Sequence, residues 1–243
     1  HVAFVFNNGV TNGSKVFIDG VAQTPFTYNP GTPSTTTLAI GNSPGNPQNF
    51  NGTIDEVRIW NTALCDGAII NQRNCELGGT LSSNLLAYYH FNQGIDAGNN
   101  TSITNLIDAT GNYNGTFSGF ALTGSTSNFL SGGSTPSGTT CTYVPLTATA
   151  ANTGPYCEGA TISVSSTPNG GTATYSYAWA SSAGGAWTAT GSPATRASST
   201  TAMSGAYNVT VTDASSCSTT ATTSVTVNAN PTASAGTALA AIC

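Results

Sequence analysis

Alternation of apolar and polar residues with a period of two dominates the second half of the chain. It is strict over residues 205–213 and recurs over 161–164, 175–179 and 222–227. Because successive side chains of a strand point to opposite faces of a sheet, this pattern predicts half-buried β-strands. Turn-forming Gly, Asn and Ser residues separate the strands, so we expect an antiparallel sandwich over residues 150–230.

The first half of the chain carries shorter apolar runs with turn signals between them. Predicted strands cover residues 1–6, 15–18, 38–41 and 53–60. Residues 85–91 are apolar on both faces, as in a central strand that is covered on each side. Only residues 65–74 combine a helix-like apolar pattern with an acid, Asp66, near the start. We therefore expect an all-β protein with one short helix.

A segment without large apolar side chains, residues 131–140, separates the two halves and is predicted to be a flexible linker. The tail 239–243 resembles residues 153–157, which predicts that a further repeat begins near the C-terminus. The expected organisation is a first domain, a linker, a second domain, and a linker leading into the next repeat. These parts cover residues 1–132, 133–149, 150–230 and 231–243.

Composition excludes two classes of partner. Only 5% of the 243 residues are charged, and the formal net charge is −5. Four Lys and Arg residues cannot build a phosphate-binding surface, so nucleic acid is not an expected partner. No apolar run approaches the roughly 20 residues that span a bilayer, so we expect no membrane span in this segment. Thr, Ser, Asn and Gly make up about half of the chain, which suits strands joined by tight turns.

The cysteines indicate an extracellular location. There are six, but no Cys-x-x-Cys pair, and His1 and His90 are the only histidines, so a zinc site is not predicted. Disulfide bonds in an oxidising compartment are the better interpretation. Cys141 is left unassigned, and Cys243 is expected to belong to the next repeat.

Two disulfides are predicted from positions along the chain. Cys157 precedes the first strong strand of the second domain and Cys217 follows its longest strand, so we expect these two to pair. Cys65 and Cys75 are expected to pair across the short helical segment. A continuous ten-residue helix would hold them about 15 Å apart, so this second pairing requires the helix to break.

No enzymatic activity is expected. A retaining glycosidase needs two carboxyl groups about 5–5.5 Å apart. The adjacent acids Asp55 and Glu56 are neighbours on a predicted strand and would point to opposite faces of its sheet. His1 is terminal and His90 lies in a closely packed predicted strand, so neither suggests a nucleophilic triad.

Several spaced motifs carry a family resemblance. They are His-Val-Ala-Phe-Val-Phe at 1–6, Val-Phe-Ile-Asp-Gly at 16–20 and Phe-Asn-Gly-Thr-Ile-Asp-Glu-Val-Arg-Ile-Trp-Asn at 50–61. In this order they resemble the C-terminal half of a laminin-G-like domain, a jelly roll of the concanavalin A-like lectin/glucanase group. Residues 86–93 and 108–115 resemble the opening motifs of the same family, although here they follow the closing strand. We therefore expect a partial jelly roll with an extension over residues 1–132.

The second domain resembles a different family. Its pattern Gly-x-Tyr-x-Val-x-Val-x-Asp at 205–213 is similar to polycystic-kidney-disease-type and related immunoglobulin-like repeats of bacterial surface proteins. Together the two resemblances imply a segment of a large secreted adhesin of gliding, Bacteroidetes-type bacteria, exported by the type IX route. The first domain would bind a glycan or a cell or substratum surface, and the second would be a spacer. Two alternatives are a non-catalytic carbohydrate-binding region of a secreted polysaccharide-degrading enzyme, and a purely structural stalk or filament subunit.

The resemblance also implies candidate site residues. Concanavalin A-like domains often hold a structural calcium ion through an acid near the start of the closing strand, which corresponds to Asp55 here. Asp108 could serve a similar loop, although Asp55 could instead cap a turn or pair with Arg58, and Asp108 could form an Asx-turn. Trp187 lies in a loop-like Gly-Gly-Ala-Trp-Thr setting and is the candidate for stacking on a sugar. Trp60 and Trp179 are expected in the core.

Overall fold

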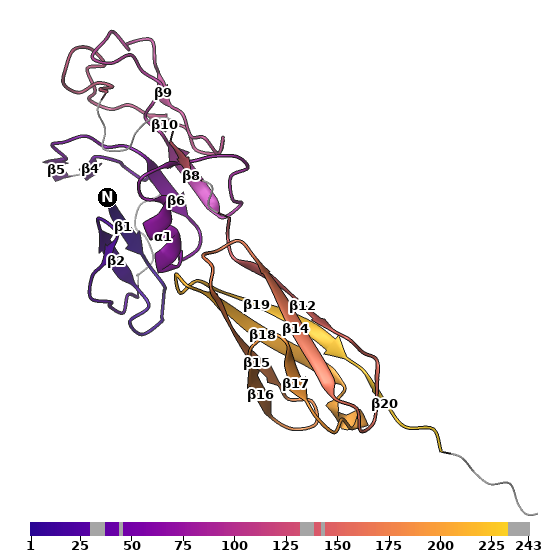
Figure 1. Cartoon of the computed structure of the whole chain (residues 1–243). Coiled ribbons are helices and arrows are strands. Elements are labelled where there is room, and N and C mark those ends of the chain that lie inside the picture. Colours follow the sequence, from indigo (N-terminus) through magenta and orange to yellow (C-terminus); the bar gives the residue numbers. More distant parts are fainter. Residues whose placement is uncertain (30–36, 44–45, 132–138, 142–143, 233–243) are drawn as a thin grey trace, which may run out of the picture. The chain divides into compact units, whose positions relative to one another are not determined.

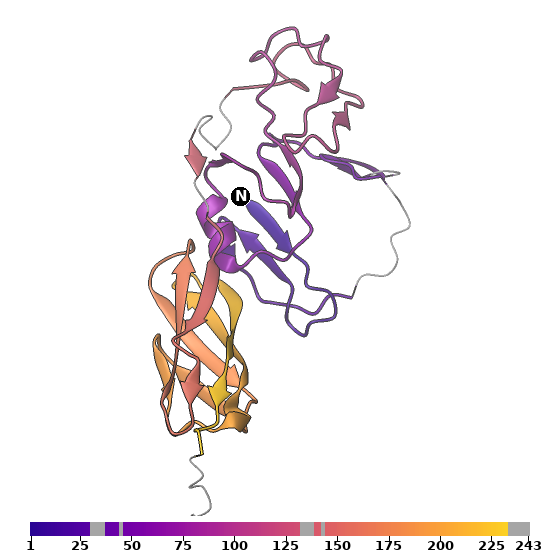
Figure 2. The ribbon, with the colours of Figure 1, turned by 90° about the vertical axis from the view of Figure 1, so that its right-hand side faces the viewer.

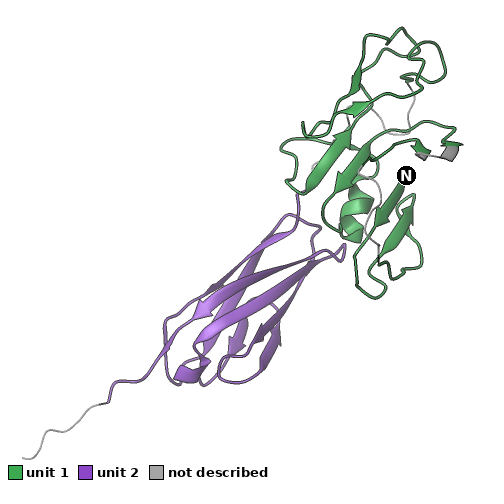
Figure 3. Ribbon diagram, turned by 180° about the vertical axis from the view of Figure 1, so that it is seen from behind, with its two compact units in different colours: residues 1–143 green, residues 144–243 purple. Residues whose placement is uncertain are grey.

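The computed structural model describes residues 1–29, 37–43, 46–131, 139–141 and 144–232. Two compact units divide the chain, unit 1 over residues 1–143 and unit 2 over residues 144–243 (Figure 3). Strands dominate both units, so the all-β prediction is confirmed. Among the described residues, no helix has the length and apolar character needed to cross a membrane.

Unit 2 is built from two antiparallel sheets and a short parallel pair (Figure 1, Figure 2). The three-stranded sheet has the order β12 (Thr147–Asn152), β14 (Ile162–Asn169), β17 (Ala194–Arg196). The four-stranded sheet has the order β16 (Trp187–Thr190), β15 (Tyr175–Ser181), β18 (Gly205–Asp213), β19 (Ser218–Val225). The pair joins β13 (Tyr156–Cys157) to β20 (Val227–Asn228), and a 3-10 turn, η1, covers Thr201–Met203.

The alternation along β18 explains the core of unit 2. Tyr207, Val209 and Val211 are fully buried, whereas the residues between them face outward. Trp179 of the neighbouring strand is 1% exposed, and its indole N–H donates a 3.0 Å hydrogen bond to the Gly191 carbonyl. Its prediction as a core residue is therefore confirmed. One contiguous apolar cluster fills the space between the sheets.

Unit 1 is assembled from small sheets. One is three-stranded, with β1 (Val2–Val5), β2 (Lys15–Ile18) and β3 (Val21–Ala22) in that order. The other sheets are strand pairs: β4 (Asn42–Ser43) with β5 (Asn46–Asn49), β6 (Val57–Trp60) with β8 (Leu85–Tyr89), β7 (Glu76–Leu77) with β11 (Thr140–Cys141), and β9 (Asn105–Leu106) with β10 (Gly115–Thr116). A cluster around Ala87, Tyr89, Leu106 and Phe129 forms its apolar core.

The predicted helix is present as α1 (Asp66–Gln72). Lys15 holds its first turn, because the ammonium lies 2.7 and 2.9 Å from the two carboxylate oxygens of Asp66. Arg58 holds its last turn by donating a 2.7 Å hydrogen bond to the Gln72 carbonyl. A cation at the C-terminal carbonyls also complements the helix dipole.

The predicted Cys65–Cys75 disulfide is wrong. Cys75 bonds to Cys141, 66 residues further along the chain, with the two Cα atoms 5.2 Å apart. The parallel pairing of β7 with β11 places these two cysteines side by side. Cys65 is also disulfide-bonded, but it stands at the N-cap of α1, with the helix separating it from Cys75.

The predicted Cys157–Cys217 disulfide is wrong as well. Cys157 is an exposed free thiol on β13, which pairs with β20 just beyond the end of β19. Cys217 is buried and disulfide-bonded, and it precedes the start of β19. The eight residues of β19 separate the two ends of that strand by about 26 Å, far beyond the reach of a disulfide.

The predicted linker is too long at both ends. Thr140 and Cys141 form β11 of unit 1, and β12 of unit 2 already begins at Thr147. Strand β11 and the first three residues of β12 lie within the predicted linker of residues 133–149. Composition alone misled here because Thr-rich segments serve as strands as well as linkers in this chain. The residues predicted to start a further repeat, 233–243, lie outside the described residues.

Candidate functional site

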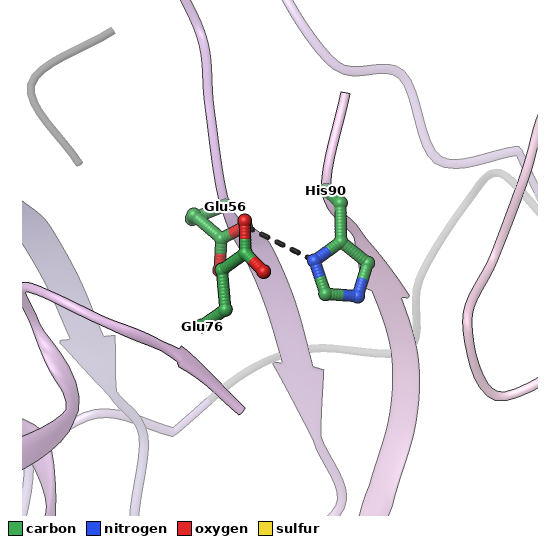
Figure 4. Close-up of side chains that lie close together, drawn as sticks. All are labelled: Glu56, Glu76 and His90. Atoms are coloured by element: carbon green, nitrogen blue, oxygen red, sulfur yellow. Dashed lines mark hydrogen bonds and ion pairs between the residues drawn. The ribbon is translucent and has the colours of Figure 1, made fainter. Parts of the chain in front are cut away.

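Three ionisable side chains from separate segments of unit 1 converge at one place (Figure 4). Glu56 immediately precedes β6, Glu76 opens β7, and His90 immediately follows β8. Their ligand atoms all lie within 4.8 Å of one another, and this is the one such group of His, Cys, Asp or Glu among the described residues. Glu56 Oε1 lies 3.2 Å from His90 Nδ1.

The pairing of β6 with β8 brings Glu56 and His90 together. In this antiparallel ladder Val57 lies opposite Tyr89, so the residues that flank this pair, Glu56 and His90, are also neighbours. Glu56 has a φ of 54° and therefore leaves the extended conformation just before the strand begins. The expectation that Asp55 and Glu56 lie on a regular strand is wrong, since β6 starts at Val57.

A buried ion pair fixes the Glu56 carboxylate. Its Oε2 atom accepts a 2.6 Å hydrogen bond from Arg58 Nη2 and another from the Tyr88 hydroxyl. The Glu56 and Arg58 side chains are only 8% and 11% exposed. Burial, followed by the hydrogen bond to Glu56, raises the pKa of Tyr88 to about 12, so the hydroxyl remains a donor at neutral pH. Arg58 thus pairs with Glu56, not with Asp55 as the sequence analysis allowed.

Asp55 lies within the electrostatic reach of this cluster. Partial burial raises its pKa, and the negative charge of Glu56 adds to that rise. Its carboxylate is not part of the group whose ligand atoms come together. Asp55 is thus a neighbour of this group but not one of its members, and calcium binding at Asp55 stays a prediction.

Asp108 has the environment of a turn anchor. It is 2% exposed. Its Oδ1 accepts hydrogen bonds from the Tyr88 and Thr110 N–H groups at 2.8 and 3.0 Å. Its Oδ2 accepts hydrogen bonds from the Thr110 hydroxyl and from the N–H groups of Asn112 and Tyr113 at 2.6, 3.1 and 2.9 Å. Donors rather than other ligand oxygens surround the carboxylate, so the geometry favours the Asx-turn over a calcium ion.

Trp187 borders an open hollow on unit 2. The structure places it at the start of β16 rather than in a loop. One side of the indole packs on Tyr207, with 5.4 Å between ring centroids, and the Arg196 guanidinium lies 5.9 Å from the indole centroid. The hollow has a volume of about 360 Å³, and its lining includes the polar side chains of Ser182, Thr188 and Asn208. The indole is partly buried and packs against the apolar core of unit 2, so a sugar contact at Trp187 stays a prediction.

Glu76 and His90 were not predicted from the sequence as partners of Glu56. The three residues are separated by 20 and 14 positions and share no motif. A useful signal was present in the two apolar strands that follow Glu56 and precede His90, because antiparallel pairing of these strands would bring the two residues together. Glu76 gave no comparable signal, since its place depends on β7 and the disulfide beside it.

Comparison with known proteins supports the resemblance of the first part. The laminin G family model described as the concanavalin A-like lectin/glucanases superfamily matches residues 1–69. This span includes Glu56 but neither Glu76 nor His90. No curated protein matches the chain. The matched fold is one used in general for carbohydrate or surface binding.

Proposed function

We propose that this chain is a binding segment of a secreted or cell-surface bacterial adhesin. In this proposal the laminin-G-like part binds a glycan or a cell or substratum surface, and unit 2 is a spacer that precedes further repeats. The match of residues 1–69 to the concanavalin A-like family carries the proposal. Type IX export and a role in gliding belong to the same proposal and rest on the family resemblance alone.

The covalent chemistry supports an extracellular location. The Cys75–Cys141 disulfide closes a loop across most of the second half of unit 1. Such bonds persist in oxidising compartments and are rare in the cytosol. A surface with few charges is also common to both units, because only 5% of the chain is charged.

Unit 2 supports the spacer role. Its strands divide into β12, β14 and β17 against β15, β16, β18 and β19, a split that resembles the two sheets of immunoglobulin-like sandwiches. We assign it to the immunoglobulin-like or polycystic-kidney-disease-type repeats on this topology and on its sequence pattern. Repeats of this kind stack in series and contact their neighbours, which suits a stalk.

The proposal includes no catalytic role. Of the carboxylates that come closest together, Glu56 already accepts hydrogen bonds from Arg58 and Tyr88 through one oxygen. A general acid or nucleophile needs a carboxylate that is accessible to the sugar. Structural calcium at Asp55 remains a prediction, which binding measurements with Ca²⁺ and with EDTA would test.

A glycan array probed with the full chain tests the binding role. We expect selective binding of a small group of glycans in the presence of divalent cations. Trp187→Ala, which removes the ring beside the hollow, separates the two units as binding sites. Lost binding in a variant that remains folded places the glycan at this ring, and unchanged binding excludes Trp187 as the contact.

The alternatives give different results. A polysaccharide-binding region of an enzyme would retain the chain on one insoluble polysaccharide and show little selectivity for short glycans. A structural stalk would bind neither class of ligand. Complete absence of binding to glycans, insoluble polysaccharides and cell surfaces would contradict the adhesin proposal.

A further inference from the structure

We propose that Glu56, Glu76 and His90 form a binding site for one Zn²⁺ ion. The site is independent of the glycan-binding proposal, and it lies partly outside the span that matches the laminin G family. Asp55, the residue at which calcium is expected, is not one of its ligands.

The ligand set is suited to zinc rather than calcium. Zn²⁺ binds imidazole nitrogen and carboxylate oxygen readily, and three protein ligands with one open position are common for it. Ca²⁺ takes six to eight oxygen ligands and does not select imidazole. A site with one histidine and two glutamates therefore favours the borderline transition metals. Among these metals we choose Zn²⁺ because it is redox-inactive and suits a purely structural or binding site.

The spacing is close to that of a tetrahedral zinc site. With metal–ligand bonds of about 2.0–2.1 Å, neighbouring ligand atoms of a tetrahedron lie about 3.3 Å apart. Glu56 Oε1 and His90 Nδ1 are already 3.2 Å apart. Glu76 must move by less than about 1.5 Å to complete the set, since all three ligand atoms lie within 4.8 Å.

Glu76 is free to make this movement. One of its oxygens accepts an exposed 2.7 Å hydrogen bond from Asn92, which water can replace. Glu56 is held in place by Arg58 and Tyr88 through its other oxygen, so Oε1 stays directed at His90 (Figure 4). The site thus has a fixed ligand in Glu56 and an adaptable ligand in Glu76.

The local charge also favours a cation. The neighbouring carboxylates are Glu56, Glu76 and Asp55, and Arg58 is the cation that contacts the cluster. Because Arg58 balances one carboxylate, negative charge remains in excess. A divalent ion would offset that excess and would link β6, β7 and β8 through their ends.

Isothermal titration calorimetry of the full chain with Zn²⁺ tests the site. Among the described residues, one other histidine and one free thiol could bind zinc and must be removed first. His1→Gln eliminates chelation by the terminal imidazole, and alkylation without reduction blocks the free thiol of Cys157. In this background we expect one Zn²⁺ per chain, with no competition from an equal concentration of Ca²⁺.

Glu76→Gln and His90→Gln identify the ligands. Each is expected to weaken Zn²⁺ binding by more than about 10-fold, the least that loss of even an outer-shell partner usually costs. Glu158→Gln in unit 2 removes the same charge elsewhere and is expected to leave binding unchanged. Far-UV circular dichroism checks that each variant is folded. Glu76 and His90 are only partly buried, so we expect their substitution to leave the fold intact.

Substitution with Co²⁺ gives a second readout. A ligand set of nitrogen and oxygen should give visible d–d bands typical of a four- or five-coordinate ion, without the charge-transfer band of a thiolate. Absence of zinc binding in the His1→Gln alkylated chain would overturn the proposal. Binding that His90→Gln leaves unchanged, or binding of Ca²⁺ as tight as that of Zn²⁺, would overturn it too.

Discussion

The two units bury their apolar residues very differently. In unit 2 the apolar residues of β14, β15, β18 and β19 meet in one core between two sheets. Among the described residues, all but one of the large apolar side chains with high exposure belong to unit 1, and the exception, Val144, is the first residue of unit 2. The apolar face of a strand is buried only when another layer of the structure covers it.

Strand β1 illustrates the difference. Its four residues, Val2–Val5, are all apolar, yet Val2 and Phe4 are 59% and 62% exposed. Phe17 on the neighbouring strand β2 is fully buried. Apolar strand residues therefore form a core in unit 2 but leave an apolar surface in unit 1, so the sequence pattern identifies strands without showing what covers them.

Polar and covalent links have a larger part in unit 1. The buried Glu56–Arg58 pair ties β6 to the end of α1, and the Cys75–Cys141 disulfide ties β7 to β11. These links replace some of the apolar packing that holds unit 2 together. Perturbing each kind of interaction should therefore affect the two units unequally.

Trp179→Ala is expected to have the largest effect, and to act on unit 2. Removing this buried indole leaves a cavity and an unpaired Gly191 carbonyl. The expected loss is about 3–5 kcal/mol in the free energy of unfolding. Hydrogen exchange of the full chain, measured peptide by peptide, should show faster exchange over residues 144–232. Equal acceleration in unit 1 would contradict the expectation that the effect is confined to unit 2.

Loss of the Cys75–Cys141 disulfide is expected to act on unit 1. The bond closes a loop with a sequence separation of 66. Replacing both cysteines by serine should reduce the free energy of unfolding by about 2–4 kcal/mol through greater freedom of the unfolded chain. Hydrogen exchange should accelerate in β6, β7 and β8, and Cys157→Ser is the matched control, since that thiol is free. Unchanged exchange in unit 1 would show that apolar packing suffices there.

Local elements could be predicted from the sequence, whereas contacts between distant segments could not. Strand β18 has the same bounds as the predicted segment 205–213, because alternation is a local property. The cysteine partners were wrong because β7 and β11 pair over a long sequence separation. The cluster at Glu56 was not predicted for the same reason, since its three residues come from distant segments. In addition, the backbone at Glu56 is left-handed, a conformation usually taken by glycine, so the sequence carries no sign of it.

Asp108→Asn is expected to have an intermediate and pH-dependent effect. Burial would raise the pKa of Asp108, but the hydrogen bonds from Thr110, Tyr88 and Tyr113 outweigh burial and lower it. The carboxylate therefore stabilises the fold fully above its unfolded pKa of about 3.9, and this contribution is lost as pH falls through the lower folded value. At neutral pH the loss in the variant should be about 1.5–3 kcal/mol.

The pH dependence of unfolding provides the check. The difference in the free energy of unfolding between the wild type and Asp108→Asn should be constant between about pH 5 and 7, because a carboxyl group with a reference pKa of about 3.9 is ionised there. The difference should become smaller in acid. Asp213→Asn is the counterpart in unit 2, where the carboxylate accepts hydrogen bonds from the N–H groups of Thr172, Ser215 and Cys217. A difference for Asp108→Asn that grows in acid would contradict the anchor role.

Phe4→Ala is expected to have the smallest effect, and it tests the contrast between the units most directly. Phe4 is 62% exposed and makes a stacked contact with Phe6 at 6.2 Å between ring centroids. An exposed side chain of this kind should change the free energy of unfolding by less than about 0.5 kcal/mol. Phe17→Ala on the adjacent strand removes the same side chain from a buried site and should cost about 3–5 kcal/mol. Chemical denaturation of the two variants compares them directly. A cost above about 1 kcal/mol for Phe4→Ala would mean that another molecule or segment covers this face in solution. The two units would then differ in what covers their strands and not in how their strands are built.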